Sequence, residues 1–112
     1  MKTVLNPVKV LSAQSLAATV TKDLPELFAY YGLAIQLNFS AANTLVGSLK
    51  MQVSVDGENF VDYASFTPIT VFSANSIFFL DNKMFPFKAS RLVYTATSGA
   101  GTVDVWIDGV RI

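Results

Sequence analysis

The chain has 112 residues, which is enough for one domain with a single hydrophobic core. Its eight basic and eight acidic residues balance and the basic residues do not cluster, so the sequence offers no basic surface for nucleic acid. No cysteine is present, which excludes a disulfide framework and a thiolate metal site. The apolar runs are short, and the sequence therefore predicts neither a membrane span nor a secretion signal.

The low content of charged residues is the main compositional signal. Charged residues make up 14% of the chain and hydrophobic residues 52%, whereas soluble domains commonly carry about 25% charged residues. A folded monomer of 12.1 kDa exposes on the order of 6,000 Å² of surface. Few ionic groups then leave weakly polar tracts of the kind that contact other proteins. We therefore expect a homo-oligomer or a subunit of a larger assembly.

The N-terminal region contains two predicted short strands and a segment whose pattern of core residues is weaker than in the rest of the chain. Strands are predicted at residues 8–11 and 16–21. Residues 1–12 contain Pro7, and we expect them to form an arm that lies on an adjacent subunit, with the β-sandwich domain at residues 13–112. Residues 23–28 are the one stretch that could begin a helix, of one or two turns, with Asp23 as its N-cap.

In the remaining chain, the sequence pattern predicts short strands separated by turns. Apolar and polar residues alternate strictly at residues 33–40, 49–56 and 102–108, so each of these strands has one buried face. Trp106 interrupts the polar face of the last strand. Asp56-Gly57 is a hairpin-turn signal. Further strands are predicted at residues 60–63, 69–72, 76–80 and 91–97. About eight or nine strands at this spacing predict an all-β fold, either a sandwich or a barrel. Of the two, we expect a single antiparallel β-sandwich.

Catalytic chemistry has few candidates in this sequence. Histidine is absent, so with no cysteine either, the usual nucleophilic triads cannot be assembled. Gly99 and Gly101 precede a strand rather than a helix and do not form a phosphate-binding loop. Two groups of carboxylates could in principle serve a glycosidase: Asp56, Glu58 and Asp62, and Asp104 and Asp108. We expect them to be turn and surface residues, and we predict no enzyme.

The first carboxylate group could also bind calcium. Asp56, Glu58, Asn59 and Asp62 offer oxygen ligands within a short loop. A hairpin turn explains the same residues without an ion. We therefore keep Asp56, Glu58 and Asp62 as weak metal candidates and expect no cofactor.

Aromatic residues form the other candidate site. Tyr30 and Tyr31 are adjacent, so in an extended segment one of them points outward, and Trp106 lies on a polar strand face. Exposed tyrosine and tryptophan anchor protein interfaces or stack on sugar rings. The apolar run at residues 77–80, followed by a second one at residues 84–87, is either covered on both faces within the domain or covered on one face by a neighbour. The interface candidates are Tyr30, Tyr31, Phe78, Phe85 and Trp106.

Three blocks carry a family resemblance, at residues 34–36, 47–60 and 91–102. They resemble the small β-sandwich structural proteins of tailed bacteriophage virions, over roughly residues 16–112. The resemblance implies a jelly-roll-like sandwich, distantly discoidin-like, located in the virion as capsid decoration, cement or a tail component. It also implies that residues 34–39 pair with residues 49–55, and that residues 91–97 and 101–107 form the closing hairpin.

A carbohydrate-binding or host-adsorption module of discoidin-like type is the alternative. Its sugar platform would be built from exposed aromatic residues: Tyr30, Tyr31, Tyr63 or Trp106. An enzyme that uses the carboxylates is a third and weaker hypothesis. Binding of glycans would favour the module, and a defined oligomer would favour the virion subunit.

Overall fold

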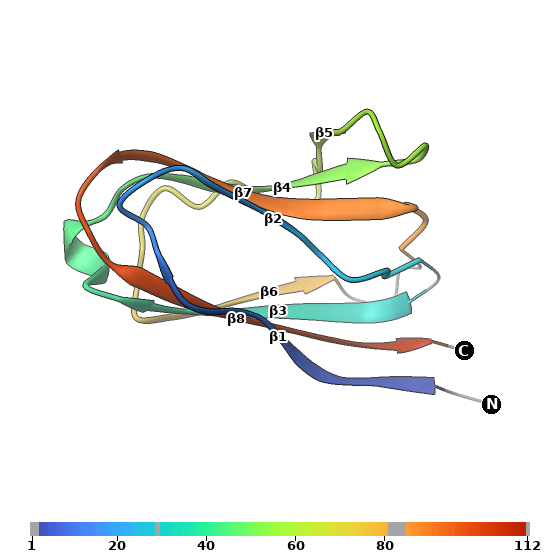
Figure 1. Ribbon diagram of the computed structural model, residues 1–112. Coiled ribbons are helices and arrows are strands. Elements are labelled where there is room, and N and C mark those ends of the chain that lie inside the picture. The colour runs from blue at the N-terminus through green and yellow to red at the C-terminus, as the bar shows by residue number, and fades with distance from the viewer. Residues whose placement is uncertain (1–2, 29, 81–84, 112) are drawn as a thin grey trace.

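The computed structural model describes residues 3–28, 30–80 and 85–111, and it is all-β (Figure 1). Alternating apolar residues and turn-forming residues produce eight described strands and one short 3-10 helix. In chain order the elements are β1 (Thr3–Ser15), β2 (Val20–Asp23), β3 (Tyr30–Ser40), η1 (Ala42–Thr44), β4 (Val46–Ser54), β5 (Val61–Asp62), β6 (Asn75–Leu80), β7 (Ala89–Ser98) and β8 (Thr102–Arg111).

The strands form two antiparallel four-stranded sheets that pack face to face (Figure 1). The first sheet has the order β1-β8-β3-β6 and the second has the order β2-β7-β4-β5. Every connection between consecutive strands passes from one sheet to the other, except the β4–β5 hairpin. This arrangement of eight strands is a jelly roll. The predicted single antiparallel β-sandwich of jelly-roll type is confirmed.

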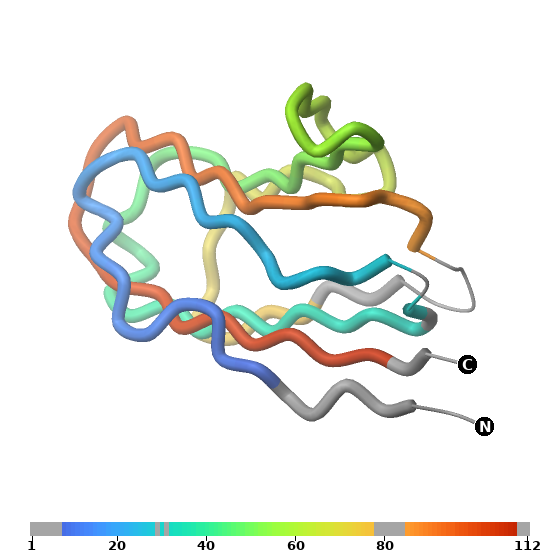
Figure 2. Tube along the Cα trace, turned by 45° about the vertical axis from the view of Figure 1, so that its right-hand side comes forward, coloured from blue at the N-terminus to red at the C-terminus, as the bar shows by residue number. Residues whose placement is uncertain are grey.

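Two expected strand pairings are wrong. Strands β3 and β4 lie in opposite sheets, because β3 pairs with β6 and β8 while β4 pairs with β5 and β7. Strands β7 and β8, expected as a closing hairpin, also lie in opposite sheets and pair with different strands, so the chain crosses from one layer to the other between them (Figure 2). Alternation identifies the buried face of a strand, but it holds no information about the neighbouring strand. The intervening turns cross the sandwich rather than reverse within one sheet.

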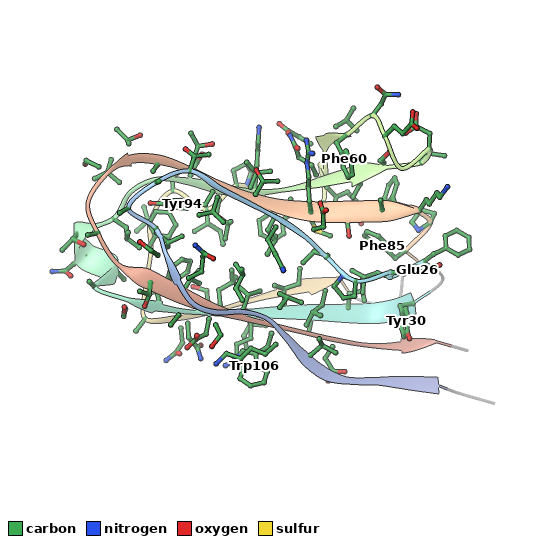
Figure 3. All side chains as sticks on the ribbon, in the orientation of Figure 1. Glu26, Tyr30, Phe60, Phe85, Tyr94 and Trp106 are labelled. Atoms are coloured by element: carbon green, nitrogen blue, oxygen red, sulfur yellow. The ribbon has the colours of Figure 1, made fainter. Side chains whose placement is uncertain are left out.

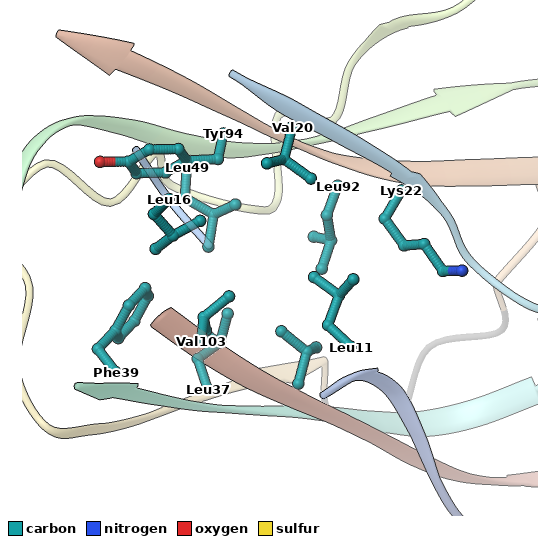
Figure 4. Close-up of a pocket in the computed structure, with 11 residues that line it drawn as sticks. Leu11, Leu16, Val20, Lys22, Leu37, Phe39, Leu49, Leu92, Tyr94 and Val103 are labelled. Atoms are coloured by element: carbon teal, nitrogen blue, oxygen red, sulfur yellow. The ribbon is translucent and has the colours of Figure 1, made fainter. Parts of the chain in front are cut away.

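Much of the core consists of the apolar residues that the alternation predicts. Strand β3 contributes Leu33, Ile35, Leu37 and Phe39 from one sheet, and β4 contributes Leu49, Met51 and Val53 from the other. Full burial of each such side chain stabilises the fold by about 1.5–3 kcal/mol. The sheets leave a cavity of about 10 Å³ between them (Figure 4), about the space that one water molecule needs.

The N-terminal segment belongs to the first sheet of its own chain. Strand β1 runs through the expected boundary between residues 12 and 13 and pairs with β8 (Figure 2). The register shifts at three places, and Ala13 adopts a left-handed conformation with φ of 47° near the last shift. The residues of the expected arm, from Thr3 onward, thus form an edge strand. Their contact with an adjacent subunit stays a prediction.

Two local expectations are wrong. Asp23 ends β2 instead of capping a helix, and residues 24–28 have no helix. Leu24 continues the strand pairing, because its backbone N–H donates to the Ser90 carbonyl at 2.9 Å. Residues 69–72 form no strand, although Ile69 makes an isolated bridge to Leu49 of β4. In both segments tertiary hydrogen bonds decide the backbone conformation.

Candidate functional site

One row of side chains crosses the outer face of the first sheet. Lys9 of β1 lies opposite Trp106 of β8, Trp106 lies opposite Gln36 of β3, and Gln36 lies opposite Ile77 of β6. Residues directly opposite each other in a sheet share a face. The neighbouring Ile107 is buried in the core, so the row faces outward. Figure 3 shows Trp106 on the outside of the sandwich.

Trp106 is held in place by its neighbours on β1 and β8. The Lys9 ammonium lies 5.1 Å from the centroid of the indole ring, within the range of a cation–π interaction. The same ammonium lies 3.5 Å from Asp104 Oδ1, which also accepts the backbone N–H of Ala13 at 2.6 Å. The Ala13 hydrogen bond, and to a lesser degree Lys9, hold the pKa of Asp104 below its usual value. These contacts orient the indole while leaving it half-buried.

A shallow depression lies beside the indole. Its volume is about 170 Å³, and it is lined by Ala34, Gln36, Ile77, Trp106, Ile107 and Asp108. The Ile77 side chain is 67% exposed. Gln36 donates to Asn38 Oδ1 at 3.3 Å, and Asp108 accepts the backbone N–H of Gly109 at 2.7 Å. We call these six residues the Trp106 face. It combines an apolar floor with a few polar groups.

The apolar tract continues around the outer edge of β6. A second depression of about 320 Å³ lies there, lined by Phe66, Thr67, Ile69, Val71, Ser76 and Ile77. Val71 is 85% exposed, and Ile77 lines both depressions. Ile77 and Val71 are not among the interface residues predicted from the sequence. The signal that could have found Ile77 is the uncharged run at residues 75–80, where strict alternation is absent.

Two of the predicted interface residues are in the core, which corrects that prediction. Tyr30 and Phe85 are buried, and Figure 3 shows both between the sheets or at their end. The Phe85 backbone N–H donates to the Tyr30 carbonyl at 2.8 Å, and the Phe85 ring packs against Tyr63 with centroids 5.8 Å apart. Because the chain folds back over the open end of the sandwich here, the rings close that end.

Of the other three interface candidates, only Trp106 has a side chain that the structure describes. The side chains of Tyr31 and Phe78 lie outside the part of the chain whose side chains are described. By register, Tyr31 lies opposite Val110 and Phe78 lies opposite Ile35. Trp106 alone among the described candidates reaches the surface, as the break in the polar alternation of β8 predicts.

Both carboxylate oxygens of Asp56 accept hydrogen bonds from residues of its own turn. Its Oδ1 accepts the backbone N–H groups of Glu58 and Asn59, each at 2.8 Å, and the Ser54 hydroxyl at 2.7 Å. Its Oδ2 accepts the Asn59 side-chain amide at 2.8 Å. These hydrogen bonds, with Asn59 the largest contributor, hold the pKa of Asp56 far below its usual range. The turn interpretation is confirmed, and the oxygen atoms that an ion would need already have donors.

The remaining carboxylates are also engaged locally. Asp62 accepts Gln52 Nε2 at 3.0 Å and lies 3.1 Å from the Lys50 ammonium, and these two partners lower its pKa, Gln52 more strongly. Glu58 is exposed on the turn. Across the described residues, no three acidic, histidine or cysteine side chains gather to hold a metal ion.

Comparison with known proteins does not assign the chain to a family. No protein-family model matches the sequence, and no curated protein matches it. Within the described part of the chain, no helix has the length and apolarity needed to cross a membrane. The fold places the chain in the class of small jelly-roll β-sandwiches, and apolar side chains lie partly exposed on the outside of its first sheet.

Proposed function

We propose that this chain is a non-enzymatic structural subunit of a virus particle. Its role would be capsid decoration, cement or a minor component of the capsid or tail, and it would act through contacts between subunits. The Trp106 face carries this proposal, because it exposes an oriented indole and Ile77 together. Large aromatic residues in such positions are typical anchors of protein interfaces.

Composition and fold also support the proposal. Sixteen charged side chains share an accessible surface of 6261 Å², so burial of apolar area against neighbours is the main source of attachment energy, at about 25 cal/mol per Å² before association costs. Jelly rolls are common in viral capsid and lectin domains, which is an analogy at the level of fold. The sequence resemblance to phage structural proteins points the same way.

Particle occupancy tests the proposal. Particles from the virus that encodes the chain should contain it in many copies by quantitative mass spectrometry. Purified chain added to particles that lack it should bind, and Trp106→Ala should bind at least about tenfold more weakly, as expected for a central anchor. Val55→Ala is the matched control, because Val55 is 75% exposed and lies outside the first sheet. Absence from the particles, or equal binding of both variants, would contradict the proposal.

A sugar-binding module is the second candidate, because the half-buried indole lies in a depression with the amide of Gln36 and the carboxylate of Asp108. An aromatic floor with polar hydrogen-bonding groups is a usual way to hold a sugar ring. Tyr30 is buried and cannot serve as the platform. Glycan-array binding that Trp106→Ala abolishes, with particle occupancy unchanged by the same substitution, would favour this module.

A further inference from the structure

The four edge strands of the sandwich differ in how they are protected. Strands β1 and β6 form the edges of the first sheet, and β2 and β5 form those of the second. An edge strand presents unpaired backbone N–H and C=O groups, which are a template for pairing with another chain. Proteins commonly prevent this pairing with short strands, charges, proline or β-bulges.

Three of these edges carry such features. Strand β1 contains Pro7 and Lys9, and its register with β8 shifts at three places. Strand β2 has four residues, of which Lys22 and Asp23 are charged. Strand β5 has only two residues.

Strand β6 carries none of them. Its six residues, Asn75–Leu80, include no charged residue and no proline. Its register with β3 runs without interruption from the Asn75–Asn38 pair to the Leu80–Leu33 pair. Uncharged segments of this length and β-propensity are the ones that pair with other strands when exposed. Among the described edges, β6 is thus the one left open.

Ladder geometry shows which backbone groups of β6 face outward. The Phe39 N–H donates to the Ala74 carbonyl at 2.8 Å, so this pair is a hydrogen-bonded one. In an antiparallel ladder, hydrogen-bonded pairs alternate along the strand. The N–H and C=O groups of Ile77 and Phe79 therefore point away from β3. The Asn75 carbonyl points outward as well, where it accepts the Ser73 hydroxyl at 3.1 Å.

We propose that β6 pairs antiparallel with β6 of a second copy of this chain, about a two-fold axis at Ile77. The two Ile77 residues exchange backbone hydrogen bonds, and Asn75 of each copy lies opposite Phe79 of the other. The pairing joins the two first sheets into one continuous sheet. This inference rests on the proposed role as an assembling subunit and names its partner.

Three observations favour a second copy over a different protein. The strand carries no charge, so no like charges meet across the axis. Each copy brings exposed apolar surface to the contact, since Ile77 is 67% and Val71 is 85% exposed. The depression beside β6 is lined by six residues, none of them charged, so nothing there selects an oppositely charged partner. A two-fold contact of this kind closes on itself and stops at a dimer.

The pairing should be concentration-dependent. Six residues at about 3.3 Å each give a contact of roughly 20 Å in length, which is short for an interface of about 800 Å² per partner. We expect a dimer that dissociates on dilution, and one that many copies bound to a particle would reinforce.

Cysteine cross-linking tests the contact directly, because the chain has no cysteine of its own. In a hydrogen-bonded antiparallel pair the two Cα atoms are about 5.5 Å apart, which is within the range of a disulfide. Mild oxidation of Ile77→Cys should therefore give a covalent dimer. Val61→Cys on edge strand β5 is the matched control, since Val61 is 65% exposed and Ile77 is 67% exposed. Failure of Ile77→Cys to cross-link, or equal cross-linking of both variants, would overturn the proposal.

Sedimentation equilibrium provides the second measurement. The wild-type chain should form a dimer with a Kd below about 1 mM. Ile77→Lys, which places a charge on the open edge, should raise that Kd at least about tenfold, whereas Val55→Lys should leave it unchanged. A monomer at about 1 mM, an Ile77→Lys dimer of unchanged Kd, or oligomers that grow beyond two copies would each refute the two-fold pairing. The measurement uses the isolated chain, so the Kd of the dimer does not depend on whether the chain occurs in particles.

Discussion

At the residue scale, two buried hydroxyl groups among the described residues lack a hydrogen-bond partner, those of Ser90 and Tyr94. Tyr94 lies on β7 and its ring packs edge-on against Phe72, with centroids 5.8 Å apart. Its buried hydroxyl has no hydrogen-bond partner among the described residues, and this burial raises the pKa of Tyr94. A buried hydroxyl without a partner costs about 1–3 kcal/mol of stability.

Tyr94→Phe should therefore stabilise the protein. We expect the free energy of unfolding to rise by about 1 kcal/mol, because the substitution removes the hydroxyl and keeps the ring contacts. Urea unfolding of the wild type and the variant measures the difference. Tyr63→Phe is the control, since Tyr63 is only half-buried and its hydroxyl gains little from removal. A clear loss of stability in Tyr94→Phe would show that the hydroxyl does have a partner.

At the scale of single elements, Asp104 joins the irregular strand β1 to β8. Its Oδ1 accepts the Ala13 N–H and attracts Lys9, and both residues belong to β1. The register shift near Ala13 leaves that N–H without a ladder partner, and the carboxylate replaces it. The same carboxylate orients Lys9 over Trp106, so the edge strand and the Trp106 face depend on one side chain.

The contacts of Asp104 with β1 lead to a prediction about stability in acid. The pKa of Asp104 in the folded protein lies below its usual value, so its stabilisation is present above about pH 4 and is lost as the pH falls through the folded-state pKa. Asp104→Asn should lower Tm at neutral pH and should flatten the fall of Tm on acidification. Thermal unfolding followed by circular dichroism over a pH series measures both effects. Asp23→Asn, at an exposed position on β2, is the control, and identical pH profiles for Asp104→Asn and wild type would contradict the prediction.

At the scale of the whole molecule, the N-terminal segment completes the first sheet. Strand β1 is the neighbour that β8 has on one side, and its Val10 and Leu11 pack against the core. An arm that served only an adjacent subunit would make no such contacts with its own domain.

Removal of residues 1–12 should therefore weaken the isolated domain. The truncation exposes one side of β8 and takes Val10 and Leu11 from the core, and we expect a loss of about 3 kcal/mol or more. Urea unfolding measures it. Removal of residues 1–2 is the control, because it leaves β1 (Thr3–Ser15) whole. Unchanged stability together with weaker binding to particles would support a free arm instead.

Local patterns could be predicted because their causes lie close together in the chain. The alternation from Leu33 to Phe39 places one face of β3 in the core whatever strand lies beside it. The turn at Asp56 closes with donors no more than three residues away. The outward position of Trp106 follows from its place between Asp104 and Asp108 on the same strand.

The sequence by itself thus determined an all-β sandwich, most of its strands, its buried faces and the outward position of one indole. Tertiary structure alone decided which strands pair, that Tyr30 and Phe85 close the end of the core, and that β6 is left as the unprotected edge. The physical reason is distance along the chain. Alternation and turn chemistry act between near neighbours, whereas pairing such as that of β1 with β8 depends on packing between segments about a hundred residues apart.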